Sequence, residues 1–229
     1  IFNSGDFEAA VRERTAAENI SNVLYPEDST PQGKELRLQQ QYFFVAASLR
    51  DLITRTLEQG ATIADLPARI TFQLNDTHPV IAVPELMRLL VDEYEVAWAT
   101  AWDIARQIFN YTCHTLLPEA LEVWPVDLME RLLPRHMEII FRINKEFLDE
   151  VSLKTGNELL VRSMSIIQEQ PNRAVRMAHL ATVGSTKVNG VAELHSQLLR
   201  DDVLKDFSAY WPDKFTNVTN GVTPRRFVR

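Results

Sequence analysis

Eleven prolines divide this chain of 229 residues into segments, and most of them stand between stretches of apolar periodicity rather than inside them. Proline lacks a backbone N–H and clashes with the preceding helical turn, so it starts or ends a helix more readily than it continues one. Pro118, Pro125 and Pro134 therefore predict a series of short helices, the last running to about Val151. Because the chain has only 7 glycines, the pattern favours a helix-rich fold.

Helical spacing is clearest in the first quarter of the chain. Ser4 or Asp6 can cap a first helix. A loop at residues 25–31, with a proline near each end, precedes a long helix predicted for residues 33–60. The apolar positions that share a face are Phe7, Ala10 and Val11 in the first helix and Leu38, Tyr42, Val45, Ala46, Leu49, Leu52 and Ile53 in the second.

Two segments have the composition of strands, residues 70–74 and residues 215–219. The first leads into a polar turn at residues 75–79, and the second leads into Asn220-Gly221, a strong turn signal. Residues 188–191 are interpreted as a tight turn. Further helices are predicted from Pro84, with Leu86, Leu89 and Leu90 inward, and over residues 98–111, 175–185 and 193–199. The fold class expected is therefore a helix-dominated α/β protein with few strands.

Composition excludes several classes of protein. The formal net charge of -7 disfavours a nucleic-acid partner, which needs a basic surface. No apolar run reaches the roughly 18–20 residues that span a bilayer, and no membrane association is expected. Cys113 is the single cysteine, which excludes an internal disulfide and fits a reducing, cytoplasmic setting. The first residue is not Met, residues 1–6 lack the basic stretch followed by an apolar one that is typical of a signal peptide, and both ends look cut from a longer protein.

The polar turn at residues 75–79 is the first candidate for chemistry. It follows a predicted strand, and ligands bind at the carboxyl ends of strands in open α/β sheets. Asp76 and His78 could form a hydrogen-bonded acid–base pair or two metal ligands. They could equally belong to an Asx turn, with Pro79 opening a helix.

A second candidate lies at residues 111–115, where polar and small residues interrupt an apolar helix before Pro118. His114 at this helix end could contact a ligand or be a buried structural histidine. Cys113 is better explained as a small buried apolar residue than as a nucleophile. Glu119 and Glu122 are explained most simply as charges in the first turn of a helix.

Residues 133–136 and 188–196, which include His136 and His195, are each explained by capping and packing. The chain has no phosphate-loop glycine spacing, no Cys/His zinc pattern and no Gly-x-Ser-x-Gly motif. The residues alone predict an α/β fragment, with a polar site built from Asp76, His78 and His114.

Taken together, seven segments are more specific than any of them alone. They are Val23-Leu24-Tyr25-Pro26, Lys34-Glu35-Leu36-Arg37-Leu38, Leu74-Asn75-Asp76-Thr77-His78-Pro79, His114-Thr115-Leu116-Leu117-Pro118-Glu119-Ala120-Leu121-Glu122, Leu133-Pro134-Arg135-His136, Val188-Asn189-Gly190-Val191 and Thr219-Asn220-Gly221-Val222-Thr223-Pro224-Arg225-Arg226. In order and spacing the chain resembles the α-glucan phosphorylases, which act on glycogen, starch or maltodextrin, over essentially its whole length.

The resemblance implies a two-lobed, GT-B type glycosyltransferase with a Rossmann-like core in each lobe. Residues 1–219 would be the second half of the amino-terminal lobe, and residues 220–229 the crossover into the other lobe. The implied reaction is reversible phosphorolysis, in which a terminal α-1,4-glucosyl unit passes to orthophosphate with retained configuration. The implied cofactor is pyridoxal 5'-phosphate on a lysine outside this chain, and its phosphate relays protons. The implied full-length enzyme is a homodimer, and this chain alone is expected to be inactive.

The resemblance also implies roles for individual residues. It places His114 and Asn220 at the sugar, and Asp28 in a mobile loop that gates the site, with Ser29 beside it. It lines the pocket beside the glucosyl unit with Asp76, His78 and Glu122. Arg226 and Phe227 are expected towards the pyridoxal pocket, and no metal is expected.

Several positions depart from the family pattern. Ser29 stands where the family often has Asn with a contact to the sugar 2-hydroxyl, and a serine reaches less far. Cys113 stands where Asn is common, and Phe227 replaces a Trp and loses its indole donor. Arg55, preceded by Thr54, is the only one left of two adjacent arginines that bind a phosphate activator in the animal enzymes, which argues against nucleotide activation.

The sequence is also compatible with three other functions. The chain could be a non-catalytic glucan-binding or regulatory module, a metal-dependent hydrolase that uses Asp76, His78 and His114, or a helical structural domain.

Overall fold

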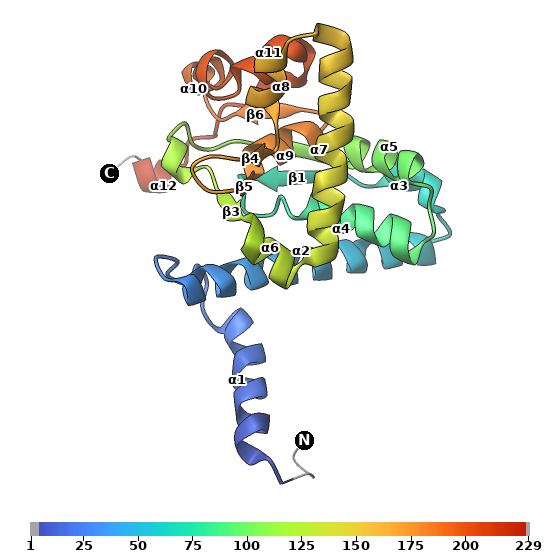
Figure 1. The fold of residues 1–229 in the computed structure, drawn as a ribbon, viewed down its shortest axis with the longest axis vertical. Coiled ribbons are helices and arrows are strands. Elements are labelled where there is room, and N and C mark those ends of the chain that lie inside the picture. Colours follow the sequence, from blue (N-terminus) through green and yellow to red (C-terminus); the bar gives the residue numbers. More distant parts are fainter. Residues whose placement is uncertain (1–4, 228–229) are drawn as a thin grey trace.

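A four-stranded parallel sheet lies at the centre of the structure, a computed structural model that describes residues 5–227 (Figure 1). Its strands follow one another in space as they do in the chain, in the order β1-β2-β6-β7, and every neighbouring pair is parallel. All four carboxyl ends therefore meet at one edge of the sheet. The strands are β1 (Phe72–Asn75), β2 (Phe109–Thr112), β6 (Val188–Gly190) and β7 (Phe215–Asn217).

The predicted strands at residues 70–74 and 215–219 are confirmed by β1 and β7, but β2 and β6 correct the sequence interpretation. The helix predicted to reach Tyr111 ends at Ile108, and the next four residues form β2. His114 therefore follows a strand, not a helix. The tight turn predicted at residues 188–191 is the fully buried strand β6.

Tertiary contacts explain why an Asn-Gly pair lies in a central strand rather than in a turn. Asn189 Oδ1 accepts a hydrogen bond from Thr112 Oγ1 at 2.8 Å, and Asn189 Nδ2 donates to Gly190 O at 2.9 Å. A buried amide is tolerated only when such partners are present, and one of the two, Thr112, comes from the neighbouring strand β2.

A second, three-stranded antiparallel sheet has the order β3-β5-β4. This sheet corrects two predictions. Pro125, expected to divide two short helices, ends strand β3, and Val175, expected to begin a helix, lies in strand β5. Its strands are β3 (Val123–Pro125), β4 (Ile167–Gln168) and β5 (Ala174–Arg176).

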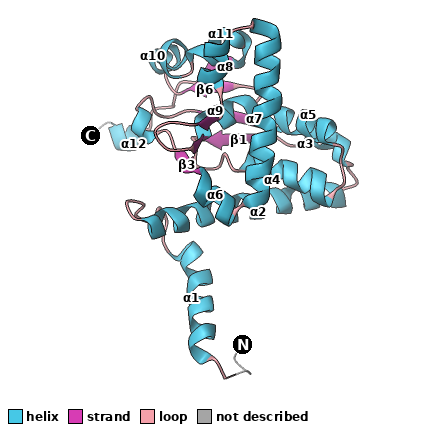
Figure 2. Cartoon of the chain, viewed as in Figure 1, coloured by secondary structure: helices cyan, strands magenta, loops and turns pink. Residues whose placement is uncertain are grey.

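Helices form most of the rest of the molecule (Figure 2). The long helix predicted for residues 33–60 is confirmed as α2 (Pro31–Glu58), capped by Thr30, whose side chain accepts a hydrogen bond from Gly33 N. The remaining α-helices are α3 (Leu66–Arg69), α4 (Ala82–Arg88), α5 (Trp98–Ile108), α6 (Val126–Leu132), α7 (Pro134–Thr155), α8 (Glu158–Met164), α9 (Met177–Gly184), α10 (Glu193–Leu198), α11 (Lys205–Tyr210) and α12 (Pro224–Phe227). Short turns of other helix types are η2 (Ile63–Asp65), η3 (Leu89–Glu93), η4 (Pro118–Ala120), η5 (Leu199–Val203) and η6 (Pro212–Lys214).

The core is organised around α4, in which the six residues before Arg88 are all buried. A helix that is buried on all its faces reads as apolar all round, as this one does apart from Glu85. It packs against α2, α5, α7 and α9. Leu86, Leu89 and Leu90 are at most 1% exposed, which confirms that they point inward.

Helix α1 (Phe7–Asn22) projects away from this body (Figure 1). Asp6 caps it by accepting a hydrogen bond from Ala9 N, whereas Ser4, the alternative cap, lies outside the described residues. No residue of the helix is buried, and the side chains of Phe7 and Val11 are 58% and 57% exposed. In the described part of the chain, no helix has both the length and the apolar character to cross a bilayer.

Candidate functional site

The carboxyl edge of the parallel sheet collects most of the polar residues that the sequence predicts for the site. Asp76 follows β1, His114 follows β2, and Asn220 follows β7. Parallel strands place such segments side by side, and in open α/β sheets this edge binds ligands. The candidate site is therefore built from loops that a rigid sheet holds in place.

Asp76 joins the first two of these loops. Its backbone has a φ of 63°, a left-handed conformation that Asp and Asn adopt more readily than most residues. Its two carboxylate oxygens accept hydrogen bonds from Thr77 N at 2.6 Å and from His114 N at 3.2 Å. The predicted convergence of Asp76 and His114 is thus present in the structure.

These contacts leave Asp76 poorly suited to bind a metal, because both of its carboxylate oxygens already accept backbone N–H groups. Across residues 5–227, no group of three or more His, Cys, Asp or Glu side chains is arranged to hold a metal ion.

Glu122 is the centre of the second part of the site. Its side chain is 11% exposed and accepts hydrogen bonds from Arg37 Nη2 at 2.7 Å and from Gln41 Nε2 at 2.9 Å on one oxygen, and from Thr77 Oγ1 at 3.0 Å on the other. His78 Nδ1 lies 3.1 Å from the oxygen that Arg37 contacts. We call His78, Glu122 and Arg37 the edge cluster. Glu122 lies between η4 and β3, so it is not in the first turn of a helix as the residues alone suggest.

The contacts of the edge cluster decide the tautomer of His78. An arginine can only donate, so the approach of Arg37 Nη2 to His78 Nδ1 at 3.4 Å is no hydrogen bond if that nitrogen carries a proton. The shorter contact is the one to the Glu122 carboxylate, which can only accept when ionised. We therefore assign a proton to His78 Nδ1, which donates to Glu122.

This pairing changes the acidity of both partners. The hydrogen bond to Glu122 raises the pKa of His78, with further contributions from the charges of Glu122 and Asp76. Burial by itself would raise the pKa of Glu122, but the hydrogen bonds from His78 and Gln41 and the charge of Arg37 outweigh it and hold that pKa below its ordinary value. Both shifts favour a charged His78–Glu122 pair.

Arg37 connects the edge cluster to the predicted gating loop. Its Nη1 donates to Asp28 Oδ2 at 2.6 Å, and its guanidinium lies 5.8 Å from the centre of the Tyr25 ring. The loop also folds tightly onto the start of α2, because a Cβ atom on Gly33 would come within 1.8 Å of Glu27 O. Ser29 Oγ donates to Glu27 Oε2 within the same loop at 2.7 Å.

Arg37, Gln41 and Thr77 are residues of the site that the sequence does not single out. Arg37 and Gln41 are four residues apart in α2, so they lie on the same face of the helix, and this spacing is the one sequence signal for the pair. Their shared partner, Glu122, is more than 80 residues away in the chain and is visible only in the fold.

A cavity of about 490 Å³ lies against the edge cluster. It is walled mainly by charged and polar side chains, which suit a ligand rich in hydroxyl groups. Its lining residues are Asp28, Lys34, Arg37, Asp76, His78, Thr115, Glu119, Ala120, Leu121, Glu122, Val123 and Trp124.

Other predicted residues lie at the edge of the sheet without joining this network. The side chains of His114 and Asn220 are exposed, and the backbone N–H of Asn220 donates to Val191 O at 3.0 Å. Arg226 is exposed on α12, and no contact among the described residues links it to the edge cluster. Phe227 ends α12, but its side chain lies outside the described residues.

Cys113 has the structural role that its sequence position suggests. It is fully buried, and its Sγ donates to Thr115 O at 3.0 Å. Burial raises the pKa of the Cys113 thiol, which keeps it protonated and unreactive.

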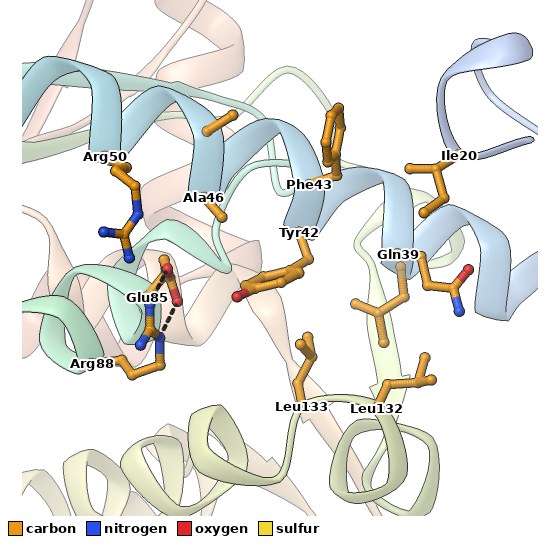
Figure 3. Close-up of a pocket in the computed structure, with 12 residues that line it drawn as sticks. Ile20, Gln39, Tyr42, Phe43, Ala46, Arg50, Glu85, Arg88, Leu132 and Leu133 are labelled. Carbon is orange, nitrogen blue, oxygen red and sulfur yellow. Dashed lines mark hydrogen bonds and ion pairs between the residues drawn. The ribbon is translucent and has the colours of Figure 1, made fainter. Parts of the chain in front are cut away.

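A larger cavity, of about 560 Å³, lies between α2, α4 and α6 (Figure 3). Its walls are mostly apolar, from Ile20, Leu38, Ala46, Leu132 and Leu133, with Tyr42 pointing into it. The charged side chains at one end already have partners, because Glu85 and Arg88 pair with each other and Arg50 pairs with Glu93. This cavity suits the packing of apolar groups, so the smaller, polar cavity is the better candidate for a functional site.

Comparison with known proteins agrees with the family resemblance of the sequence. Residues 1–229 match the family model described as carbohydrate phosphorylase. The chain is 54% identical over 229 residues to a glycogen phosphorylase of Synechocystis, and 51% identical over 236 residues to the liver form of human glycogen phosphorylase. It is also 50% identical over 228 residues to a glycogen phosphorylase of Pasteurella multocida. Each match covers 99% of this chain but only 27% or 28% of the relative.

Proposed function

This chain belongs to the carbohydrate phosphorylase family, and we propose that it supplies the glucose-facing part of the active site of a longer α-glucan phosphorylase. The reaction would be phosphorolysis of terminal α-1,4-glucosyl units to glucose 1-phosphate with retained configuration. The observation that carries the proposal is the link between Asp76 and the His114 backbone at the carboxyl edge of the sheet, in a chain about half identical to glycogen phosphorylases.

The residues at this edge suit a reaction whose transition state is cation-like at the anomeric carbon of the sugar. Such a site needs oriented polar groups around the sugar hydroxyls rather than a further strong cation. In the proposal, His114 and Asn220 bind the glucosyl unit. Asp76 holds the backbone of His114 in place for that contact.

The edge cluster would shape the pocket beside the glucosyl unit. His78 and Glu122 form one wall, and Arg37 couples that wall to the gating loop through Asp28. Ser29 would contribute to sugar binding only weakly, because its hydroxyl already donates to Glu27.

Pyridoxal 5'-phosphate is the cofactor that we propose for the longer protein. Among the described residues, we propose that Arg226 lies towards this group, because its exposed guanidinium can pair with a phosphate. When bound, the cofactor supplies a phosphate group that can relay protons. Its lysine is expected elsewhere in the longer protein, so we propose that the isolated chain releases no glucose 1-phosphate from maltodextrin and phosphate.

Further partners follow from the same proposal. They are α-1,4-glucan and orthophosphate as substrates, and a second copy of the longer protein in a cytoplasmic homodimer.

A chimeric enzyme tests the proposed function directly. Residues 1–229 replace the matching segment of the Synechocystis glycogen phosphorylase, and we refer to this protein as the chimera. We expect the chimera to release glucose 1-phosphate from maltodextrin and phosphate at a rate within about tenfold of the parent enzyme, which corresponds to about 1.4 kcal/mol in the barrier.

Two controls make the result decisive. Circular dichroism and pyridoxal absorbance establish that the chimera is folded and holds its cofactor. A folded, cofactor-loaded chimera that binds maltodextrin without turning it over would contradict the proposal and support a glucan-binding module instead.

A further inference from the structure

His195 lies at the edge of the sheet between the two residues proposed to hold the sugar. It is in α10, which begins three residues after β6 ends. Since β6 pairs with β2 on one side and with β7 on the other, the segment after β6 lies between the segments that carry His114 and Asn220. Capping and packing are sufficient to explain the sequence motif around His195, and the proposed function assigns this residue no role.

Close packing fixes the position of α10 against the sheet. A Cβ atom on Gly190 would come within 2.5 Å of Ser196 Oγ and 2.6 Å of His195 Nδ1, so only glycine allows the helix to approach this closely. Ser196 Oγ also donates to Asn217 Oδ1, in β7, at 2.7 Å. The first turn of α10 is thereby held against both β6 and β7.

A backbone contact then orients the imidazole. Val191 N lies 3.4 Å from His195 Nδ1, and a backbone N–H can only donate, so Nδ1 is the acceptor. The carbonyl of the same residue accepts the hydrogen bond from Asn220 N. One residue, Val191, therefore connects His195 to the proposed sugar-binding residue Asn220.

With Nδ1 as acceptor, the proton of the neutral ring lies on Nε2. This atom is closed to solvent and has no hydrogen-bond partner among the described residues. A buried donor without an acceptor typically lowers the stability of the fold by about 1–3 kcal/mol, so an unpaired N–H at this position needs an explanation. Polar groups left unpaired in this way are often completed by a ligand.

The surroundings also keep the ring neutral. Burial lowers the pKa of His195, and the neighbouring His114 lowers it further, against a smaller opposite effect of Asp76. Near pH 7 the ring therefore carries no charge. A neutral donor is compatible with a sugar that becomes cation-like, whereas an imidazolium in the same place would oppose that charge.

We propose that His195 is a further sugar-binding residue, whose Nε2–H donates a hydrogen bond to a hydroxyl oxygen of the glucosyl unit held by His114 and Asn220. This inference rests on the proposed function. Because solvent does not reach Nε2 in this arrangement, entry of the sugar must move the side chains that cover it.

Two substitutions in the chimera separate this role from packing. His195→Asn places an amide oxygen near the position of Nδ1, where it can accept from Val191 N, but removes the donor at Nε2. His195→Gln places a donor near Nε2 and gives up the contact to Val191. We expect kcat/KM to fall about 10- to 100-fold in His195→Asn, the effect of about 1.4–2.7 kcal/mol. His195→Gln should recover part of this loss.

Monodeoxy analogues of glucose 1-phosphate, used in the direction of glucan synthesis, test the contact itself. For the analogue that lacks the accepting hydroxyl, the unsubstituted chimera and His195→Asn should have equal kcat/KM. Leu194→Ala, with a side chain that is 68% exposed on the same helix, serves as the control.

Three results would overturn the proposal. These are a larger loss in His195→Gln than in His195→Asn, a penalty that no deoxy analogue removes, and a loss of activity matched by an equal loss of folded protein in both variants. Failure of the proposed function gives a different result, because the chimera is then inactive before any substitution at His195.

Discussion

Two clusters in this molecule use the same three side-chain types, histidine, glutamate and arginine, in different surroundings. The interior cluster consists of His136, Glu85 and Arg88, from helices α4 and α7. Figure 3 shows the Glu85–Arg88 pair of this cluster. His136 Nε2 lies 2.5 Å from Glu85 Oε2, and Arg88 donates to both oxygens of the same carboxylate at 2.8 and 2.9 Å. The Glu85 and His136 side chains are only 1% and 4% exposed.

The edge cluster has the same pairing but lies on the loops that follow strands and at the start of α2. Its histidine, His78, is 35% exposed, and its arginine also holds Asp28 of the gating loop. The polar cavity opens against it, whereas Glu85 and His136 of the interior cluster are buried between helices.

Residue type alone therefore does not assign a role to these side chains. Charges between packed helices must satisfy one another, because nothing else can reach them. Charges at the carboxyl edge of a sheet can also meet a ligand. The explanation of His136 by packing is consistent with its burial, and the same explanation for His195 is incomplete because its Nε2 lacks a partner among the described residues.

The largest effect on stability is expected from a substitution that breaks the interior cluster. Glu85→Ala in the chimera leaves the buried His136 without its acceptor and leaves Arg88 its contact to Glu93, and breaking a buried pair in this way typically costs about 3–5 kcal/mol of stability. The temperature of thermal inactivation should fall by several degrees, while kcat/KM of the protein that remains folded is retained. Glu138→Ala is the matched control, since the Glu138 side chain is 67% exposed. A normal inactivation temperature in Glu85→Ala would contradict a structural role for the cluster.

The opposite pattern is expected for the exposed residues at the edge. His114→Ala and Asn220→Ala should each cost about 2–4 kcal/mol of transition-state stabilisation, the scale of losing one preorganised polar contact. That corresponds to a fall in kcat/KM of roughly tens- to a thousand-fold. Kinetics and pyridoxal absorbance are measured on the same preparation, and cofactor content should remain near that of the unsubstituted chimera. A variant that loses cofactor along with activity would show that its residue acts on the other side of the site.

A smaller effect tests the link between the edge cluster and the gating loop. Arg37→Lys keeps the charge, but one ammonium group cannot bridge Asp28 and Glu122 as the planar guanidinium does. We expect kcat/KM to fall about tenfold, the effect of about 1.4 kcal/mol, with little change in thermal stability. Arg131→Lys, at an exposed ion pair with Glu35, is the control. Equal kinetics in the two variants would remove Arg37 from the site.

The smallest effect is a change in the titration of one histidine. Since the hydrogen bond to Glu122 raises the pKa of His78, Glu122→Gln should lower that pKa. A raised pKa in the folded state stabilises the fold below the unfolded value of about 6.5, and this contribution is lost as pH rises through the folded value. The measurement is the ring chemical shift of His78 against pH in protein labelled at histidine. Glu119→Gln, in the wall of the same cavity, is the control, and an unchanged His78 titration in Glu122→Gln would exclude the assigned pairing.

The sequence by itself determined the elements whose signals are local. Helical spacing placed α2 to within two residues at each end, the alternation before Asn75 placed β1, and the motifs around Asp76 and His114 assigned the family that the comparison confirmed. These features depend on neighbours in the chain, so a linear pattern contains them.

The tertiary structure alone decided the rest. Strands β2 and β6 are short, and one of them ends in Asn-Gly, so their extended form depends on pairing within the sheet and on the partners of Asn189. The edge cluster joins Arg37 in α2 to Glu122, which is 85 residues away in the chain, and no local signal specifies this contact. His195 gains its proposed role only because β6 lies between β2 and β7, and that order is a property of the sheet rather than of any segment.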